Sequence, residues 1–405
     1  MIQFNARHLK AFVAVARAGS VAQAAGVVAR VQSAITRAVQ ELEADLQVQL
    51  FERRPQGMRL TEFGSVLLSR AEAAFAEMDR AKAAITALAP DRKWNPNAPI
   101  FTLGIGRQRL LVFVALMKQR HMGAVAEQFG VSQPAVSLAL REVEQGVGVP
   151  LVTRSPAGIV PTAVGERLEM HLRRALAELA HAQEEIASLQ QGITGRVMVG
   201  TLSLGRSWPL PQAIIATTDA HPNIRIATIE SNFEHLANLL PAGEIDLILG
   251  GLRPAEQMVD FVTRPVFRSG IVLLARQGHP LRARVARQGW AALRDARWVL
   301  PPRGTWTRSS LEASRGAEKL RPAEVVVETA DNVITRTLVG NSDLLTAASP
   351  HLFREEIASG ALTVLPLQPA APEREIGVVT RANGTLTVAA RLFIDAILAS
   401  DQPAR

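Results

Sequence analysis

The sequence predicts a multidomain protein in which two all-α units precede an α/β region of two subdomains. The chain has 405 residues, which exceeds one ordinary domain. Its first half repeats itself at a fixed offset, and from Gly195 onward helical periodicity gives way to alternating strands and helices. We therefore expect a first unit over residues 1–90, a connector over 91–107, a second unit over 108–194 and the α/β region over 195–405.

The composition is typical of a globular protein in a reducing compartment. Apolar residues make up 48% and charged residues 20% of the chain, and cysteine is absent. The lack of cysteine excludes disulfides and thiolate chemistry and favours the cytoplasm. The N-terminus does not have the pattern of a signal peptide, and no apolar window approaches the ~18 residues of a membrane span, so no membrane partner is expected. The net charge of +8 favours a polyanionic partner.

The repeat has an offset of 101 residues without any gap. Aligning Gln32 with Gln133 fixes this register, and the two copies then span about residues 7–88 (copy one) and 108–189 (copy two). The identical pairs in this register include Phe12/Phe113, Ala34/Ala135, Glu41/Glu142, Glu43/Glu144, Leu50/Leu151, Arg53/Arg154, Pro55/Pro156, Gly57/Gly158, Thr61/Thr162 and Gly64/Gly165. The chain therefore begins with a duplicated domain.

Copy two reads as short helices followed by a longer one. Apolar residues at helical spacing lie on either side of the stretch "GVSQPAVSLALREVE", where Gly130 suits a left-handed turn. Ser132 stands at an N-cap position and Pro134 in the first turn, where its missing N–H costs nothing. Helix, turn and helix in this order predict a helix-turn-helix, whose second helix offers N-terminal side chains to the DNA major groove.

A short hairpin follows each of these helices. In copy two it contains Arg154, Pro156 and Gly158, and in copy one it contains Arg53 and Arg54. Basic side chains on such a wing contact phosphates, which positions a protein on DNA without reading the sequence.

The two copies resemble the N-terminal winged helix-turn-helix of LysR-type transcriptional regulators. The family's recognition-helix start is matched by Ser132, Gln133, Pro134 and Ala135. Its later pattern is matched by Leu50, Phe51, Arg53, Leu60, Thr61 and Gly64. Copy one departs at Val31 and Ser33, and copy two departs at Leu138 and Val152. The resemblance implies double-stranded DNA as the partner, and the candidate contacts are Gln32, Ser33, Thr36, Arg37, Arg53, Arg54, Ser132, Gln133, Pro134, Ser137, Arg141 and Arg154.

Each copy ends in a long helix with a heptad seam. The seams are Leu67, Ala71, Ala74, Met78, Ala81, Ile85 and Leu88 in copy one, and Leu168, Leu172, Ala175, Leu179, Ala182, Ile186 and Leu189 in copy two. The seam can pack on its own domain, but the resemblance implies a dimerising linker helix, and we favour pairing. Helices of about 26 residues are ~40 Å long and the connector can stretch to roughly 60 Å. One chain can therefore pair its own copies, and the homo-oligomer is a dimer or a tetramer of chains.

From Gly195 onward the pattern alternates between strands and helices with largely parallel strands expected. Two crossovers, near Val266 and Leu367, divide the region into one subdomain of 195–266 with 368–400 and a second of 267–367. This order resembles the effector-binding domain of the same family, which has a periplasmic-binding-protein-like fold.

Ligands of open sheets bind beyond the carboxyl ends of strands, and three segments supply candidates. They contain Thr201, Ser203 and Arg206, then Ser231 and Asn232, then Gly304, Thr305 and Arg308. Free N–H groups at helix starts suit a carboxylate, and the last segment looks like regulators that sense aromatic or sugar acids. Each residue has a plainer interpretation: Ser203 and Thr305 as N-caps, Arg308 as an ion-pair partner of Glu312.

No enzyme constellation, metal site or cofactor motif is present in the sequence, so the protein is expected to be a regulator rather than an enzyme. An exported solute-binding protein would share the second-half fold but has no use for the helix-turn-helix pair. A regulator in which one copy is only a dimerisation scaffold is a further alternative. Over residues 7–62 and 108–163, eight basic against five acidic residues give copy one a net charge of +3, and five against three give copy two +2. We favour DNA binding by both.

Overall fold

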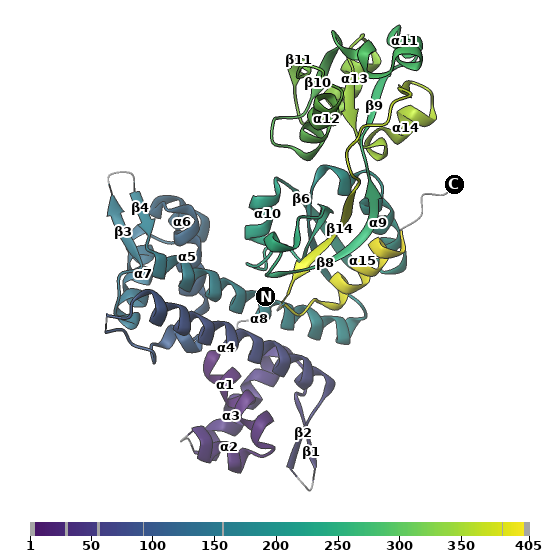
Figure 1. Cartoon of the computed structure of the whole chain (residues 1–405). Coiled ribbons are helices and arrows are strands. Elements are labelled where there is room, and N and C mark those ends of the chain that lie inside the picture. The colour runs from purple at the N-terminus through teal and green to yellow at the C-terminus, as the bar shows by residue number, and fades with distance from the viewer. Residues whose placement is uncertain are drawn as a thin grey trace.

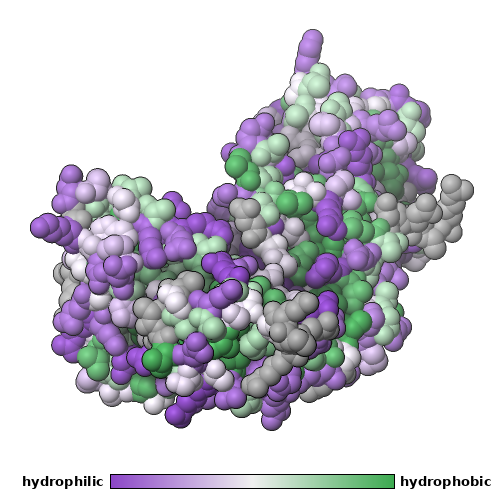
Figure 2. Space-filling model, turned by 90° about the horizontal axis from the view of Figure 1, so that it is seen from below, coloured by the Kyte–Doolittle hydropathy of each residue, from purple (hydrophilic) through white to green (hydrophobic). Residues whose placement is uncertain are grey.

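The computed structural model describes residues 5–28, 31–54, 57–91, 93–155, 158–382 and 384–400, without the side chains of residues 27, 28, 53, 54, 154, 155 and 191. Figure 1 shows the two copies on opposite sides of a pair of long helices, with the α/β region rising from the C-terminal end of the second long helix. None of the helices in these ranges is both long and apolar enough to cross a bilayer. Figure 2 shows hydrophilic side chains over much of one face, with hydrophobic ones scattered between them.

The two copies have the same order of elements. Copy one consists of α1 (Ala6–Ala18), α2 (Val21–Val28), α3 (Gln32–Leu46), β1 (Phe51–Arg54), β2 (Gly57–Leu60) and α4 (Glu62–Leu88). Copy two consists of α5 (Arg107–Gln119), α6 (Met122–Phe129), α7 (Gln133–Val147), β3 (Val152–Ser155), β4 (Gly158–Pro161) and α8 (Ala163–Gln191). In each, three helices precede an antiparallel hairpin and a long helix.

Glu43 and Glu144, which are equivalent in the repeat, make the same hydrogen bonds in the two copies. The carboxylate of Glu43 accepts from the N–H groups of Leu50 and Phe51, and Glu144 does the same for Leu151 and Val152. These bonds hold α3 against the hairpin β1–β2, and α7 against the hairpin β3–β4. Buried N–H groups at the start of a hairpin need such acceptors, which is a physical reason for glutamate at both positions.

In both copies a threonine caps the long helix where the helix follows the hairpin. Thr61 caps α4 by accepting from the N–H of Gly64, and Thr162 caps α8 by accepting from that of Gly165. A Cβ on Gly64 would lie 2.1 Å from the carbonyl oxygen of Leu50, and one on Gly165 would lie 2.0 Å from that of Leu151. Only glycine permits this close approach of helix and strand.

The long helices α4 and α8 pack against each other in antiparallel orientation within the one chain (Figure 1). Their direction follows from two ion pairs, since Arg70 contacts Glu185 whereas the later Glu77 contacts the earlier His171. The seam residues from Leu67 to Ile85 and from Leu168 to Ile186 are buried, and only the last seam positions, Leu88 and Leu189, are exposed. The heptad seams therefore mark the helix pair interface.

The connector between the copies is folded rather than stretched. It contains a short 3-10 helix, η1 (Pro99–Thr102), in which Ile100 and Phe101 are buried. Trp94 packs edge-on to Phe101 with 5.6 Å between ring centroids, and the N–H of Asn95 donates to the carbonyl of Val147 at the end of α7. The ammonium group of Lys82 on α4 lies 5.9 Å from the centroid of the Phe101 ring, so the connector contacts both copy one and copy two.

The first subdomain of the α/β region is built on a five-stranded sheet of order β6-β5-β7-β14-β8. Its elements are β5 (Gly195–Thr201), η2 (Ser203–Arg206), α9 (Pro209–Ala220), β6 (Ile224–Glu230), α10 (Phe233–Leu239), β7 (Leu247–Gly251), η3 (Ala255–Gln257), β8 (Phe261–Ser269), β14 (Arg374–Arg381) and α15 (Val388–Ala399). Strands β5, β6 and β7 are parallel, as expected, whereas β14 is antiparallel to both of its neighbours. Its direction is reversed because it enters from the second crossover.

The second subdomain contains a parallel pair, β10-β11, and an antiparallel sheet of order β12-β9-β13. Its elements are β9 (Val272–Arg276), α11 (Leu281–Gln288), η4 (Gly289–Leu293), β10 (Arg297–Leu300), α12 (Trp306–Ala317), β11 (Glu324–Glu328), α13 (Asn332–Gly340), β12 (Thr346–Ala348), η5 (Pro350–Phe353), α14 (Arg354–Ala358) and β13 (Leu362–Val364). The expectation of largely parallel strands is therefore wrong for β9, since both of its neighbours run against it.

Strand β8 is the principal element that the sequence did not predict. It pairs with β14 as far as Ser269, so the first crossover lies beyond Val266, where it was expected. Polar residues along β8 stand in adjacent pairs, Thr263 with Arg264 and Arg268 with Ser269, rather than in alternation, and Pro265 interrupts the strand where the pairing register shifts. Proline is tolerated at such a bulge on an edge strand, but in a sequence it argues against a strand.

Candidate functional site

The start of α3 in copy one is an exposed polar surface. Gln32, Ser33 and Arg37 are exposed there, and Thr36 is half-buried with its hydroxyl donating to the carbonyl of Gln32. The Nε of Arg37 donates to Glu41 one turn further along, at 2.7 Å. No side chain caps the helix, because Val31 occupies the N-cap position. Three of the four candidate side chains therefore reach solvent.

The start of α7 in copy two presents the matching surface. Ser132 accepts from the N–H of Ala135 and caps the helix as expected, and Pro134 stands in the first turn. Ser132, Gln133, Pro134 and Arg141 are exposed, whereas Ser137 is half-buried. Leu138, where copy two departs from the family's pattern, is 51% exposed, which gives this helix an apolar contact point.

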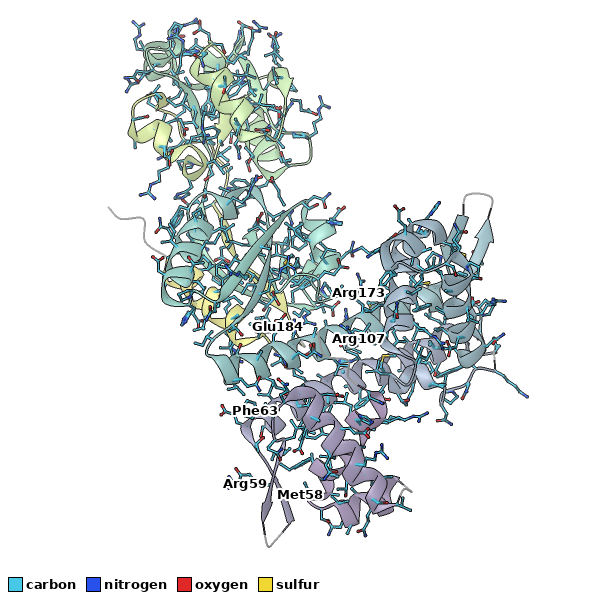
Figure 3. The ribbon with its side chains drawn as sticks, turned by 180° about the vertical axis from the view of Figure 1, so that it is seen from behind. Met58, Arg59, Phe63, Arg107, Arg173 and Glu184 are labelled. Carbon is cyan, nitrogen blue, oxygen red and sulfur yellow. The ribbon has the colours of Figure 1, made fainter. Side chains whose placement is uncertain are left out.

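The hairpins of the two copies have the expected place in the fold. In copy one the backbone of Arg53 pairs with Met58, and in copy two Arg154 pairs with Ile159. The side chains of Arg53, Arg54 and Arg154 lie outside the described residues. Figure 3 shows Arg59, on strand β2, on the hairpin of copy one that extends away from the helix pair.

A cavity of about 470 Å³ lies between the two subdomains of the α/β region. Five of the eight candidate ligand residues line it, namely Ser203, Ser231, Asn232, Gly304 and Thr305. They come from the ends of β5 and β6 and from the segment before α12, as expected for a cleft beyond the carboxyl ends of strands. We refer to it as the cleft.

Three candidates do not line the cleft. Thr201 is 1% exposed, at the end of β5. Arg206 forms an ion pair with Glu230. The Nε of Arg308 donates to Glu312 at 3.0 Å, which is the plainer interpretation of that residue. Because each guanidinium is already paired with a carboxylate, neither supplies the cleft with a free cation.

Thr305 and Asn232 line the cleft and are also helix N-caps. Thr305 accepts from the N–H of Arg308 as the N-cap of α12, and its hydroxyl donates to the carbonyl of Pro302. Asn232 caps α10 by accepting from the N–H of His235. Ser203 is not an N-cap, since Leu202 holds that position of η2. The capping side chains fix the helix starts that face the cleft.

The cleft contains an arginine that the sequence analysis missed. Arg374 is the first residue of β14 and lines the cleft, with its guanidinium 4.5 Å from the centroid of the Trp306 ring. Its Nε is buried and has no hydrogen-bond partner among the described residues. Burial, together with the charge of Arg253, lowers the pKa of Arg374 to about 10. It therefore stays charged at neutral pH without a paired carboxylate.

Gly251 gives Arg374 its position. A Cβ at Gly251 would lie 3.0 Å from Cζ of Arg374, so the guanidinium rests on the backbone of β7 on one side. Trp306 lies on the opposite subdomain's segment and contacts the same group. With glycine and an aromatic ring against it, the guanidinium offers its edge, where N–H donors meet a carboxylate in the same plane.

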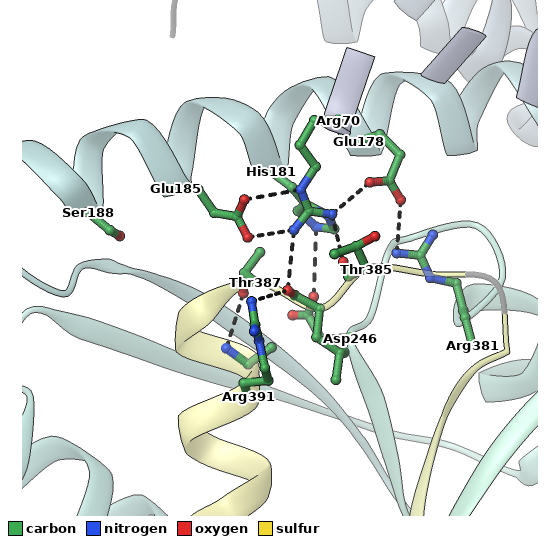
Figure 4. Close-up of polar contacts among 12 residues, drawn as sticks. Arg70, Glu178, His181, Glu185, Ser188, Asp246, Arg381, Thr385, Thr387 and Arg391 are labelled. Carbon is green, nitrogen blue, oxygen red and sulfur yellow. Dashed lines mark hydrogen bonds and ion pairs between the residues drawn. The ribbon is translucent and has the colours of Figure 1, made fainter. Parts of the chain in front are cut away.

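A second buried site links the α/β region to the helix pair (Figure 4). Arg70 on α4 donates to Glu178 at 2.7 Å and to both carboxylate oxygens of Glu185 on α8. It also donates to the carbonyl oxygens of Thr385 and Leu386, which precede α15. Arg70 is 1% exposed. One side chain therefore joins copy one, copy two and the α/β region.

Burial also shifts the pKa values of two other side chains on α8, His181 and Glu184. Burial lowers the pKa of His181 to about 3, with a smaller effect from Arg70 and Arg381. Burial, with a smaller effect from Asp246, raises the pKa of Glu184 to about 7. Glu184 lies on α8 between the helix pair and the α/β region (Figure 3). This junction therefore contains a carboxyl group that titrates near neutral pH.

Two family models match the chain. The model described as "LysR substrate binding domain" matches residues 190–402. The model described as "Bacterial regulatory helix-turn-helix protein, lysR family" matches residues 6–65 and 108–166, which cover the first three helices and the hairpin of each copy.

Relatives and solved structures agree with these models. The chain is 41% identical over 380 residues to the HTH-type transcriptional regulator GalR of Pseudomonas putida, covering 94% of this chain and 93% of the relative. It is 30% identical over 294 residues to the regulator GbpR of Azospirillum brasilense, covering 72% of this chain and 86% of the relative.

In fold it is similar to CbnR, a LysR family transcriptional regulator, with a TM-score of 0.50 and 16% identity over 73% of this chain and 99% of that one. A full-length OxyR variant from Pseudomonas aeruginosa gives a TM-score of 0.50 and 22% identity over 72% of this chain and 93% of that one. The relatives are regulators rather than enzymes. The exposed starts of α3 and α7, the two-subdomain cleft and these matches agree, and the chain belongs to the LysR family of DNA-binding, effector-sensing transcriptional regulators.

Proposed function

We propose that both copies bind DNA and that one chain presents the pair of recognition helices that usually requires two chains. The observation that carries this proposal is the antiparallel packing of α4 against α8 within one chain. It makes the two copies near-equivalent halves of a single unit, with α3 and α7 both exposed at their starts.

The copies differ in what they offer to DNA. Copy one has Arg37 on its recognition helix and Arg53 and Arg54 on its hairpin, so we assign it more phosphate contacts. Copy two has a capped recognition helix with exposed Gln133 and half-buried Ser137, so we assign it the reading of base edges. The alternative is that one copy only provides a helix for pairing.

A pair of double variants tests this division. Operator DNA is first selected from a random library with the unmodified protein, and affinity is then measured as a function of salt. Replacing Arg53 and Arg54 by Ala together should weaken binding on all sequences and reduce the slope of log K against log salt by about 2. Replacing Gln133 and Ser137 by Ala together should weaken operator binding about 10-fold or more while leaving nonspecific DNA and the slope unchanged.

Exposed Arg225 on the α/β region, replaced by Ala, is the control for general loss of charge. If one double variant binds operator like the unmodified protein, the copy that it alters does not contact DNA. The proposal that both copies bind is then wrong, and the scaffold interpretation replaces it.

We further propose that the effector is a small carboxylate bound in the cleft. Arg374 supports it, since it lines the cleft and its buried Nε has no hydrogen-bond acceptor among the described residues, and Ser203, Ser231 and Thr305 also line the cleft with hydroxyl groups. Arg374→Gln should abolish the thermal stabilisation that a binding acid produces, while DNA affinity without the acid stays unchanged. Retained acid binding in this variant would remove Arg374 from the site.

The response proposed here is a shift between two states of the α/β region. Acid binding favours the state in which the subdomains close on the cleft, and the size of the shift is limited by the difference in affinity for the two states. In this proposal the regulator acts in the cytoplasm as a homo-oligomer, and a dimer of chains presents four copies.

A further inference from the structure

Two arginines line the cleft, and neither has a carboxylate partner among the described residues. Arg374 lies 4.5 Å from the centroid of Trp306, and Arg253, which follows β7, lies 4.9 Å from that of Phe233. The acidic residue of the cleft lining is Glu230, which is engaged by Arg206. The cleft therefore contains two positive charges that no carboxylate of the described part of the chain pairs with.

These two charges act on each other. Both side chains line the same cavity, and burial together with the charge of Arg253 lowers the pKa of Arg374, as expected for two cations that repel each other there. A ligand with a single negative charge can neutralise one of them and leaves the other uncompensated. A buried charge without a partner is costly, and an opposite charge in good hydrogen-bonding geometry offsets part of that desolvation cost.

We propose that the effector is a small acid with two anionic groups, one bound at the edge of Arg374 and the other at Arg253. The proposal rests on the carboxylate effector proposed above and narrows its class. A dicarboxylate and an acid that carries a phosphate group share the required chemistry. The volume of about 470 Å³ lies at the lower end of ligand sites and suits a ligand of small size.

The far wall of the cleft adds a second feature of the ligand. It contains hydroxyl groups of the second subdomain, from Thr305, Thr307, Thr329, Thr335, Thr346 and Ser349. Those of Thr305 and Thr335 already donate to backbone carbonyls and that of Ser349 shares a hydrogen bond with Ser269, so these three keep only part of their hydrogen-bonding capacity for a ligand. Hydroxyl groups both donate and accept, so they suit hydroxyl or carbonyl oxygens between the two anionic ends. An oxygen-rich diacid satisfies both arginines and this wall.

Matched ligands that differ by one charge test the proposal. Isophthalate, its monomethyl ester and 3-phosphonobenzoate share one ring, and calorimetry on the full chain at constant ionic strength gives their affinities. We expect isophthalate or the phosphonate to bind at least 10-fold more tightly than the ester, and the better of the two identifies the second anionic group. Arg253→Gln should reduce the preference over the ester to about one, and Arg374→Gln should abolish binding of all three.

A second measurement does not depend on the shape of the ligand. Sulfate, a dianion, should raise the melting temperature of the unmodified protein more than chloride at equal ionic strength, and this excess should vanish in both variants. Arg268→Gln is the control, because Arg268 is exposed, pairs with Glu375 and does not line the cleft. The control variant should still bind isophthalate or the phosphonate more tightly than the ester, and sulfate should still raise its melting temperature more than chloride does.

The outcomes separate the two proposals. If the ester binds as tightly as the diacid and Arg374→Gln still abolishes both, the effector is a monoanion and only the two-charge proposal is overturned. If Arg374→Gln leaves acid binding and the sulfate response intact, the carboxylate site in the cleft is overturned as well. Absence of any response to all three acids and to sulfate also overturns both.

Discussion

Arg70 and His171 occupy equivalent positions of the two copies, and each contacts the equivalent glutamate of the other copy. The Nη1 of Arg70 donates to Glu178 at 2.7 Å, and the Nδ1 of His171 lies 2.8 Å from an oxygen of Glu77. Both pairs are related by the offset of 101 residues. The helix pair thus has an internal two-fold relationship that reproduces, within one chain, the self-complementary contact of a symmetric dimer.

The α/β region breaks this symmetry at Arg70. Arg70 donates to the carbonyl oxygens of Thr385 and Leu386, whereas His171, its counterpart in copy two, bonds to Glu77, and α8 leads directly into β5. The strand before these carbonyls, β14, begins at Arg374 in the cleft and ends at Arg381, whose guanidinium lies 3.5 Å from Glu178. A shift of β14 on effector binding would therefore act directly on the group that fastens α4.

Arg70→Gln should strongly destabilise the protein. The change leaves Glu178 and Glu185 facing each other without their shared cation, and breaking a buried ion pair in this way costs about 3–5 kcal/mol. Chemical denaturation followed by circular dichroism measures the loss. Arg17→Gln is the matched control, since Arg17 pairs with Glu72 at the surface and its loss should cost at most about 1 kcal/mol. Equal effects of the two changes would show that the junction contributes no more than a surface pair.

Glu184 should make stability fall as the pH rises. Its folded pKa is raised from 4.5 to about 7, mainly by burial, so the folded state holds a proton that the unfolded state has lost. The stability is complete below pH 4.5 and is lost as the pH passes 7, by about 1–2 kcal/mol once partial exposure is allowed for. Glu184→Gln should be more stable than the unmodified protein at pH 8 and similar to it at pH 4.5. A difference between the two proteins that does not change with pH would contradict this assignment.

The sequence predicts structure best where neighbouring residues decide it. The seam from Leu67 to Ile85 is buried as predicted because helical periodicity places its residues on one face. The cap at Ser132 and its loss at Val31 are also local properties, and both are observed. The cleft walls follow from strand order, which is why Ser203 and Asn232 were found.

The remaining features depend on contacts between distant segments. Arg70 meets groups on another copy and in the last part of the chain, and nothing near it in the sequence distinguishes it from a surface arginine. Arg374 was missed because it follows a crossover rather than a strand end, and its role depends on Gly251 and Trp306. A helical arginine such as Arg70, with no acidic residue three or four positions away, is a weak sequence signal for a buried ion pair with a distant segment. Only the structure shows which segment supplies its partners.

Gly165→Ala should destabilise copy two through a steric clash. The new Cβ would lie 2.0 Å from the carbonyl oxygen of Leu151, so α8 must move away from the hairpin, at a cost of about 1–3 kcal/mol or more. Gly316→Ala is the control, because a Cβ there meets nothing within 4 Å on helix α12 and should leave stability unchanged or slightly increased. Urea denaturation compares the variants, and an unchanged midpoint for Gly165→Ala would show that the helix start adapts freely.

Pairing of α4 with α8 within one chain predicts how fluorescent labels behave. The natural sequence has no cysteine, so single cysteines at Val31 and Leu138, which are exposed at the two recognition helices, can be labelled selectively. We expect energy transfer in a chain labelled at both sites, unchanged by a 100-fold excess of unlabelled protein. In a second experiment, the labelled protein is unfolded, mixed with an excess of unlabelled chain and refolded. Pairing between chains would then lower the energy transfer, whereas pairing within one chain would preserve it. Loss of transfer under that condition would mean that the long helices exchange partners, and one chain would then no longer suffice to present both recognition helices.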